Sequence, residues 1–125
     1  MAKVLVIDDD PAARQIMAAM LKQVGHEPHA CGGLTEAIHT ALTFKPDVLV
    51  TDWLLKSSHT GLEIAEALRA SHPNIGLVFI TGLPDNKVVS MARNLHPYRV
   101  VHKPCEFYQL FEAVQEVIPQ ELVSA

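Results

Sequence analysis

The sequence is poor in the features that mark several common classes of protein. It has only two cysteines, Cys31 and Cys105, without a CxxC spacing, and its seven histidines are scattered, so neither a disulfide framework nor a zinc site is indicated. No GxGxxG or GxxxxGK loop is present, which leaves nucleotide binding without support. Ten Lys and Arg stand against fourteen Asp and Glu, a net charge of -4 without a basic cluster. Direct binding to nucleic acid is therefore disfavoured.

No apolar run approaches the length that crosses a membrane, so no membrane association is predicted. The segment Met1-Ala2-Lys3 leads directly into a predicted strand without a signal peptide, which makes the cytoplasm the expected compartment. With 125 residues, 49% of them hydrophobic, the chain is long and apolar enough to bury a core. We expect one domain over residues 1–125, with residues 119–125 as a frayed tail.

What the sequence does contain is a regular alternation of short apolar runs and amphipathic segments. The apolar runs predict strands at Lys3–Ile7, Val48–Val50, Gly76–Ile80 and Arg99–His102, and a fifth strand is predicted at Glu27–Cys31, mostly from its position between two helices. Apolar residues at helical spacing predict five helices, at Pro11–Val24 (with Asp10 as N-cap and Gly25 as stop), Leu34–Leu42, Gly61–Leu68, Val88–Leu95 and Phe107–Ile118. Strict strand–helix alternation predicts an α/β domain, in which helices cover both faces of a parallel sheet.

Four of the predicted strands end in polar side chains. Asp8 and Asp9 follow the first, and Asp52, Thr81 and Lys103 follow the third, fourth and fifth. The carboxyl ends of parallel strands share one edge of the sheet, where ligands bind in such folds. Two carboxylates about 4 Å apart repel by roughly 4 kcal/mol at an effective dielectric of 20, so three need a cation or a raised pKa. Oxygen ligands of this kind suit Mg²⁺, which often also binds phosphate oxygens.

A carboxylate beside such a cation can act as a nucleophile toward phosphorus and form an aspartyl phosphate. Asp52 is the preferred candidate, since it stands alone at the end of the central strand, whereas the adjacent Asp8 and Asp9 are better placed to hold the metal. The cation and Lys103 would stabilise charge on the transferred group. Taken singly, each of these residues is better explained as a cap, turn or surface residue; their joint placement favours a phosphoryl site.

Four segments together resemble the receiver domain of two-component response regulators: Ile7-Asp8-Asp9-Asp10, the Asp52 strand, Phe79-Ile80-Thr81-Gly82 and Val101-His102-Lys103-Pro104. The resemblance covers essentially the whole chain. It implies a flavodoxin-like (βα)5 three-layer sandwich, with a parallel five-stranded sheet of order 2-1-3-4-5. It also implies that a sensor histidine kinase or histidine phosphotransfer protein donates a phosphoryl group to Asp52.

In that family pattern, Asp9, Asp52 and the backbone carbonyl of Leu54 would hold Mg²⁺, with Asp8 acting largely through water. Lys103 would contact the phosphoryl group, and Lys103-Pro104 would carry a cis peptide bond. Thr81 would bond the phosphate as a switch residue and bias the face made by the fourth helix, fifth strand and fifth helix. That face is also where a phosphorylation-dependent homodimer would form.

The sequence departs from the family pattern in three places. Val100 stands where receivers usually carry an aromatic switch residue; Tyr98, two residues earlier, points to the same face by strand parity. In the family, the loop after the phosphorylated aspartate commonly has Pro four residues and Gly eight residues beyond it. Here Lys56 stands four residues and Gly61 nine residues after Asp52, so the loop has one inserted residue and no Pro.

The third departure concerns access to the aspartate. Leu54 and Leu83, two residues beyond Asp52 and Thr81, would exclude the attacking water and give a long-lived aspartyl phosphate. Gly82 would leave room for a bulky phosphodonor. Trp53, expected to be exposed beside Asp52, would report phosphorylation by its fluorescence.

Three hypotheses remain open at this point. The first is a phosphoacceptor signalling domain that is not an enzyme in its own right and acts on a downstream effector protein or a C-terminal output domain. The second is a small Mg²⁺-dependent phosphatase or phosphotransferase with an Asp nucleophile, for which the chain leaves no room for a substrate cap. The third is a degenerate receiver that acts as a phosphate-independent interaction module.

Overall fold

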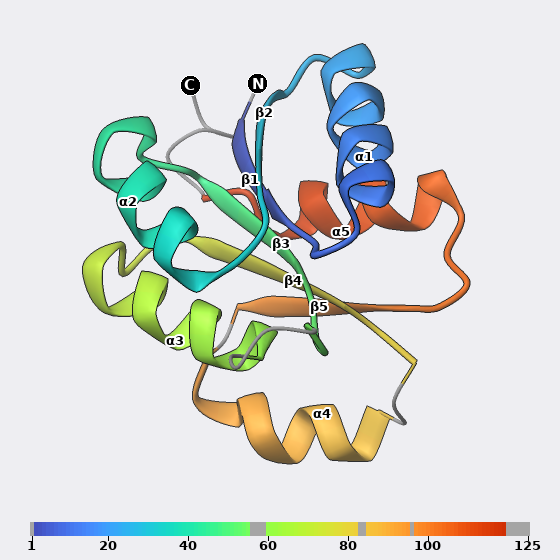
Figure 1. Ribbon diagram of the computed structural model, residues 1–125. Coiled ribbons are helices and arrows are strands. Elements are labelled where there is room, and N and C mark those ends of the chain that lie inside the picture. Colours follow the sequence, from blue (N-terminus) through green and yellow to red (C-terminus); the bar gives the residue numbers. More distant parts are fainter. Residues whose placement is uncertain (1, 56–59, 83–84, 96, 120–125) are drawn as a thin grey trace.

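The computed structural model describes residues 2–55, 60–82, 85–95 and 97–119 (Figure 1). Strands and helices alternate as the sequence predicts, with one short 3-10 helix added. In chain order the elements are β1 (Lys3–Ile7), α1 (Pro11–Gln23), β2 (Glu27–Cys31), α2 (Leu34–Phe44), β3 (Val48–Asp52), α3 (Gly61–Ser71), β4 (Gly76–Thr81), α4 (Asp85–Ala92), η1 (Arg93–Leu95), β5 (Tyr98–His102) and α5 (Phe107–Val117).

All neighbouring strands are parallel, and the sheet order is β2-β1-β3-β4-β5. The predicted flavodoxin-like topology is therefore confirmed. β1 and β3 lie side by side at the centre, in a register that pairs Ile7 with Thr51. Because both strands end within one residue of that pair, Asp8 and Asp52 reach the same edge at the point where the strand order changes direction.

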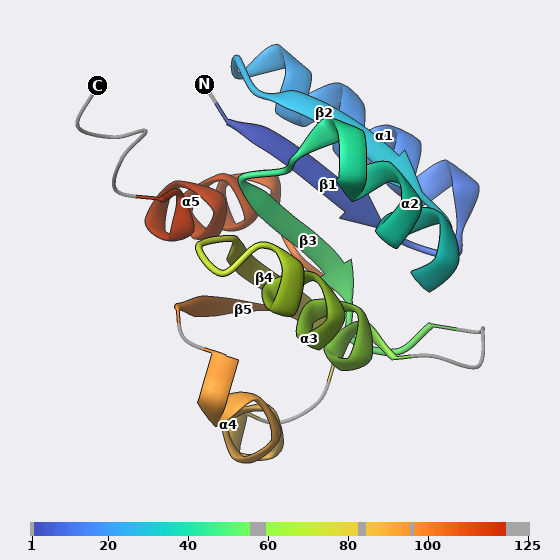
Figure 2. The same cartoon turned by 90° about the vertical axis from the view of Figure 1, so that its left-hand side faces the viewer.

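Helices cover both faces of the sheet and make a three-layer arrangement (Figure 2). An apolar core lies between the sheet and the helices on each face. On one face, α1 and α5 pack through Leu21, Leu110 and Val114 against alternate residues of the central strands, such as Val50. On the other face lie the buried residues of α2, α3 and α4, which cover the remaining strand residues. Such coverage explains why β3 and β4 are buried at every position.

Local signals mark the ends of the helices, and at α1 they are the ones that the sequence predicts. Asp10 caps α1, its carboxylate accepting the Ala12 N–H at 3.1 Å, and Pro11 occupies the first turn. Gly25, with φ of 96°, adopts a left-handed conformation just after the helix. Thr60 and Glu63 form a capping box at the start of α3. The Lys103-Pro104 bond is cis, as the resemblance implies.

Some apolar residues that predict the helices are exposed in the structure. The side chains of Ile16, Ile38, Leu42 and Met91 are 41 to 64% exposed, although all four contribute to the spacing that predicts helices. Within the described ranges, no helix has both the length and the apolar character needed to cross a membrane.

Candidate functional site

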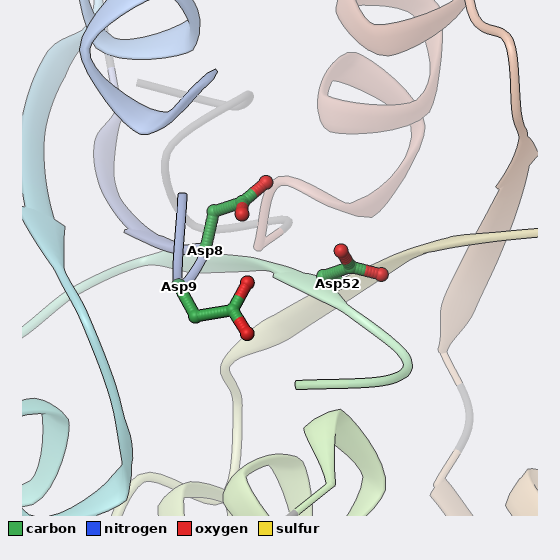
Figure 3. A group of neighbouring side chains, drawn as sticks. All are labelled: Asp8, Asp9 and Asp52. Atoms are coloured by element: carbon green, nitrogen blue, oxygen red, sulfur yellow. The ribbon is translucent and has the colours of Figure 1, made fainter. Parts of the chain in front are cut away.

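Three carboxylates converge at the carboxyl edge of the sheet (Figure 3). Asp8 and Asp9 come from the loop after β1, and Asp52 is the last residue of β3. One oxygen from each lies within 4.8 Å of the others. Asp8 and Asp52 are only 8% and 7% exposed, and Asp9 is half-buried. The structure thus brings together the three acids that the sequence assigns to one site.

The proximity of these acids has an electrostatic cost. Burial raises the pKa of the Asp8 carboxyl above its ordinary value, and the charges of Asp52 and Asp9 raise it further, against the Asp10 N–H and the charge of Lys103. A hard divalent cation would remove this repulsion, since Mg²⁺ prefers carboxylate oxygens. The donor set, its spacing and its excess of negative charge therefore fit Mg²⁺.

Lys103 joins the cluster from the segment after β5. Its Nζ donates to Asp52 Oδ2 at 2.7 Å, and the lysine side chain is 49% exposed while that of Asp52 is 9% exposed. Burial by itself lowers the pKa of the Lys103 ammonium, but the hydrogen bond to Asp52 and the charges of the three acids outweigh it, so the pKa is raised. Lys103 therefore carries its positive charge at neutral pH, in contact with the candidate nucleophile.

The backbone around the cluster is tied to its neighbours. The Asp8 N–H donates to the Cys31 carbonyl at 3.3 Å, and an Asp8 carboxylate oxygen accepts the Asp10 N–H at 2.9 Å. On the other side, Gly61 sits directly against the Asp52 carbonyl, where a Cβ would collide with it. The loop therefore returns to the site at Gly61 despite the extra residue in it. Lys56 lies outside the described residues.

A cavity of about 800 Å³ opens from the acids toward α1 and the start of α5. Its wall is polar at the sheet edge and apolar beyond it. The lining residues are Asp8, Asp9, Asp10, Pro11, Ala13, Ile16, Met17, Asp52, Leu54, Leu55, Ile80, Lys103, Cys105, Glu106, Phe107 and Leu110. Leu54 is 61% exposed, so its side chain stands at the mouth of the cavity.

The remaining residues that the sequence assigns to the site are Thr81, Gly82, Leu83 and Val100. Thr81 is buried at the end of β4, and its carbonyl accepts the Lys103 N–H at 2.9 Å. Gly82 follows it, exposed, with open space where a Cβ would be. Leu83 lies outside the described residues. Val100, at the position predicted for a switch residue, is half-buried and packs on the side of the sheet that α2, α3 and α4 cover.

The sequence-based expectation for Trp53 is wrong. Its side chain is 3% exposed and packs edge-on against Phe79, with ring centroids 5.0 Å apart. Phe79 in turn contacts Tyr98 at 6.0 Å, and Tyr98 is 6% exposed. The three rings form a buried row across β3, β4 and β5, on the same face as Val100. Strand alternation explains the burial, since Trp53 continues the face that carries Leu49.

Some residues of the site carry no signal in the sequence. Ile16, Cys105 and Phe107 line the cavity because the middle of α1 and the start of α5 converge there. Only the packing of the helices determines that convergence. Spacing along the chain does not reveal it.

Comparison with known proteins agrees with this geometry. Residues 4–115 match the sequence profile of the family described as the response regulator receiver domain. A putative NtrX-like response regulator of Rickettsia bellii is 31% identical over 103 residues, 81% of this chain and 21% of that protein. The phosphate regulon transcriptional regulatory protein PhoB of Pseudomonas aeruginosa is 25% identical over 119 residues, 92% of this chain and 51% of that protein. The chain thus spans about a fifth of the NtrX-like relative and about half of PhoB.

Solved structures share the fold. The chemotaxis protein CheY4 of Vibrio cholerae superposes with a TM-score of 0.87 at 24% identity, over 94% of this chain and 99% of that one. A receiver domain protein of Clostridium thermocellum gives a TM-score of 0.87 at 23% identity, over the full length of both chains. Together with the profile match over residues 4–115, these findings show that the chain belongs to the receiver domain family of two-component response regulators.

Proposed function

We propose that this receiver accepts a phosphoryl group on Asp52 from a phosphohistidine of a partner protein. The observation that carries the proposal is the convergence of Asp8, Asp9 and Asp52 within 4.8 Å, with Lys103 Nζ 2.7 Å from Asp52. Three acids and one amine at the carboxyl edge of a parallel sheet suit the binding of a metal and a phosphoryl group together.

The residues that would hold Mg²⁺ are Asp9 and Asp52 through their carboxylates and Leu54 through its backbone carbonyl, with Asp8 contributing through water. When bound, the cation supplies positive charge that offsets the acids and the oxygens of the phosphoryl group. The pair of buried acids and the raised pKa of Asp8 support this assignment, because both make a bound cation favourable.

In the transfer, a carboxylate oxygen of Asp52 forms the new bond to phosphorus. The phosphorus–nitrogen bond of the donor breaks, and its electron pair returns to the imidazole. Lys103 keeps its proton and its place beside Asp52, so its ammonium can bind the arriving phosphoryl oxygens as charge moves onto the new anhydride. Gly82 would leave the approach open for a partner protein.

The phosphorylated form would then signal through a conformational change. Thr81, at the end of the neighbouring strand, would bond the phosphoryl group and shift the surface made by α4, β5 and α5. Val100 is aliphatic, and Tyr98 is fixed in the core against Phe79, so the response would not use a rotating aromatic side chain on β5. A homodimer through the same surface is part of this proposal.

The partners follow from the family. A sensor histidine kinase or a histidine phosphotransfer protein would supply the phosphoryl group, and an output domain or a separate effector would respond to it. The longer relatives are named as a putative response regulator and a transcriptional regulatory protein, and this chain matches only part of each. Two free thiols, Cys31 and Cys105, are consistent with a reducing compartment such as the cytoplasm.

The test is the mass of the intact protein after incubation with acetyl phosphate and Mg²⁺. We expect the wild type to gain one phosphoryl group and Asp52→Asn to gain none. Asp47→Asn is the matched control, because Asp47 precedes the same strand at its other end and accepts the Lys3 N–H at 2.8 Å, a role that asparagine keeps. Release of phosphate without accumulation on the protein would favour a phosphatase, and no gain at all would favour a phosphate-independent interaction module.

A further inference from the structure

Arg14, in the first turns of α1, contacts the peptide unit that joins two of the acids. Its Nη1 donates to the Asp8 carbonyl oxygen at 2.9 Å. That carbonyl belongs to the planar Asp8–Asp9 peptide, so its orientation determines where the Asp9 side chain begins. We propose that Arg14 is a positioning residue that holds this peptide so that the Asp9 carboxylate faces Asp52 and the metal. This inference rests on the proposed function.

The other polar groups of Asp8 are already fixed. Its N–H donates to the Cys31 carbonyl, and its carboxylate accepts the Asp10 N–H. The carbonyl is the remaining backbone group at this residue, and Arg14 is the side chain that binds it. With all three groups held, the turn between β1 and α1 presents Asp9 in one direction. The acids must be held in this way because they repel one another before a cation binds.

Arg14 is itself held by the turn after β2. It is half-buried, and a Cβ added at Gly32 would lie 3.2 Å from its Nη1. The Gly32 N–H donates to Glu36 Oε2 at 3.2 Å, which fixes that turn relative to α2. The guanidinium therefore fits between α1, the end of β1 and the β2–α2 turn. Gly32 provides the room, because any larger residue would press on the guanidinium.

A positioning role and a purely electrostatic role of Arg14 predict opposite changes in Mg²⁺ affinity when the residue is replaced. Arg14 carries a positive charge, which repels Mg²⁺, so a simple charge effect would make Mg²⁺ bind more tightly when the charge is removed. If Arg14 instead orients Asp9, its loss weakens Mg²⁺ binding. Residues that orient metal ligands in this way typically contribute about 10- to 100-fold to metal affinity.

The first experiment is calorimetric titration of Mg²⁺ into Arg14→Met, which keeps an unbranched apolar side chain but removes the charge and the donors of the guanidinium. We expect binding at least about 10-fold weaker than in the wild type. Lys22→Met is the matched control, since Lys22 lies in the last turn of the same helix and its loss also removes one positive charge. Arg14→Lys, with charge and a donor but a shorter reach, is expected to recover part of the affinity.

A second pair of variants perturbs the guanidinium without removing it. Gly32→Ala would push on Nη1, whereas Gly33→Ala would meet nothing within 4 Å. We expect weaker Mg²⁺ binding in Gly32→Ala and unchanged binding in Gly33→Ala. In the metal-free protein, the ¹³C resonance of the Asp8 carbonyl should move upfield in Arg14→Met, because the carbonyl loses its hydrogen bond.

The outcomes separate this inference from the proposed function. Unchanged or tighter Mg²⁺ binding in Arg14→Met, or an unmoved Asp8 carbonyl resonance, would overturn the inference even if Asp52 is phosphorylated. No Mg²⁺ binding by the wild type would overturn it as well. If the wild type binds Mg²⁺ with the expected dependence on Arg14 but takes up no phosphoryl group, the proposed function fails and the positioning role stands.

Discussion

Replacing Asp8 by asparagine should make the metal-free protein more stable. Asp8 is 8% exposed, and one of its carboxylate oxygens lies within 4.8 Å of oxygens of Asp9 and Asp52, so its charge opposes folding. Asparagine has nearly the same shape and keeps the oxygen that accepts the Asp10 N–H. The substitution therefore removes the repulsion and the burial of a charge while leaving the hydrogen bond in place.

The size of the effect can be worked from the spacing. Two unit charges 4.8 Å apart interact by about 3.5 kcal/mol at an effective dielectric of 20, and by about 0.9 kcal/mol in bulk water. Asp8 is repelled by two acids and attracted by Lys103, which cancels part of the repulsion. We expect the free energy of unfolding to rise by about 1 to 3 kcal/mol in Asp8→Asn at low salt.

The pH dependence has a definite sign. The pKa of the Asp8 carboxyl is raised above its ordinary value of 3.8, so the folded protein binds more protons than the unfolded chain between the two values. The stability that Asp8 contributes is present below 3.8 and is lost as pH rises through the folded-state pKa. The gain in free energy of unfolding in Asp8→Asn should therefore be largest at neutral pH. It should vanish at a pH low enough to protonate Asp8 in both the folded and the unfolded wild type.

The assay is urea unfolding, followed by circular dichroism, with and without Mg²⁺. Saturating Mg²⁺ should stabilise the wild type more than Asp8→Asn and so narrow or reverse the difference between them. Glu66→Gln removes an acid from the exposed face of α3 and serves as the control, with no expected change. A metal-free Asp8→Asn protein that is no more stable than the wild type would show that the charge of Asp8 does not oppose folding.

Two further predictions concern the cysteines and the lifetime of the phosphorylated form. A thiol reagent should modify Cys105 in the folded protein and Cys31 only on unfolding, because Cys31 is 1% exposed and burial raises the pKa of its thiol; equal rates would contradict this. If Leu54 and Leu83 exclude water, the aspartyl phosphate should be long-lived and Leu54→Asn should shorten its lifetime in a phosphate-release assay. Release from the wild type within seconds would contradict that.

The fold and the acid cluster could be predicted because their signals are local. Asp8 and Asp9 come directly after the apolar run of β1, and Asp52 is the last residue of β3. Parallel strands that alternate with helices must end at one edge. Once β1 and β3 are neighbours, their terminal acids meet without any further information. Lys103 follows from the same rule applied to β5.

The remaining features depend on packing between elements. Arg14 is one of four polar residues on α1, and its contacts with the Asp8 carbonyl and the β2–α2 turn follow from how the helix packs. Trp53 is predicted to be exposed beside Asp52, yet it is buried in the apolar core that also contains residues of α3. The alternation of strand residues puts Trp53 on the same face as Leu49, so its burial could have been predicted from the sequence.

Asp52, rather than a neighbouring acid, is the proposed acceptor of the phosphoryl group. Borohydride reduces an aspartyl phosphate to homoserine, so reduction after treatment with acetyl phosphate and Mg²⁺ marks the modified residue for peptide mass spectrometry. We expect homoserine at position 52, with aspartate retained at Asp8 and Asp9. Homoserine at either of those positions, or a phosphorylated protein without it at position 52, would contradict the assignment of Asp52 as the acceptor.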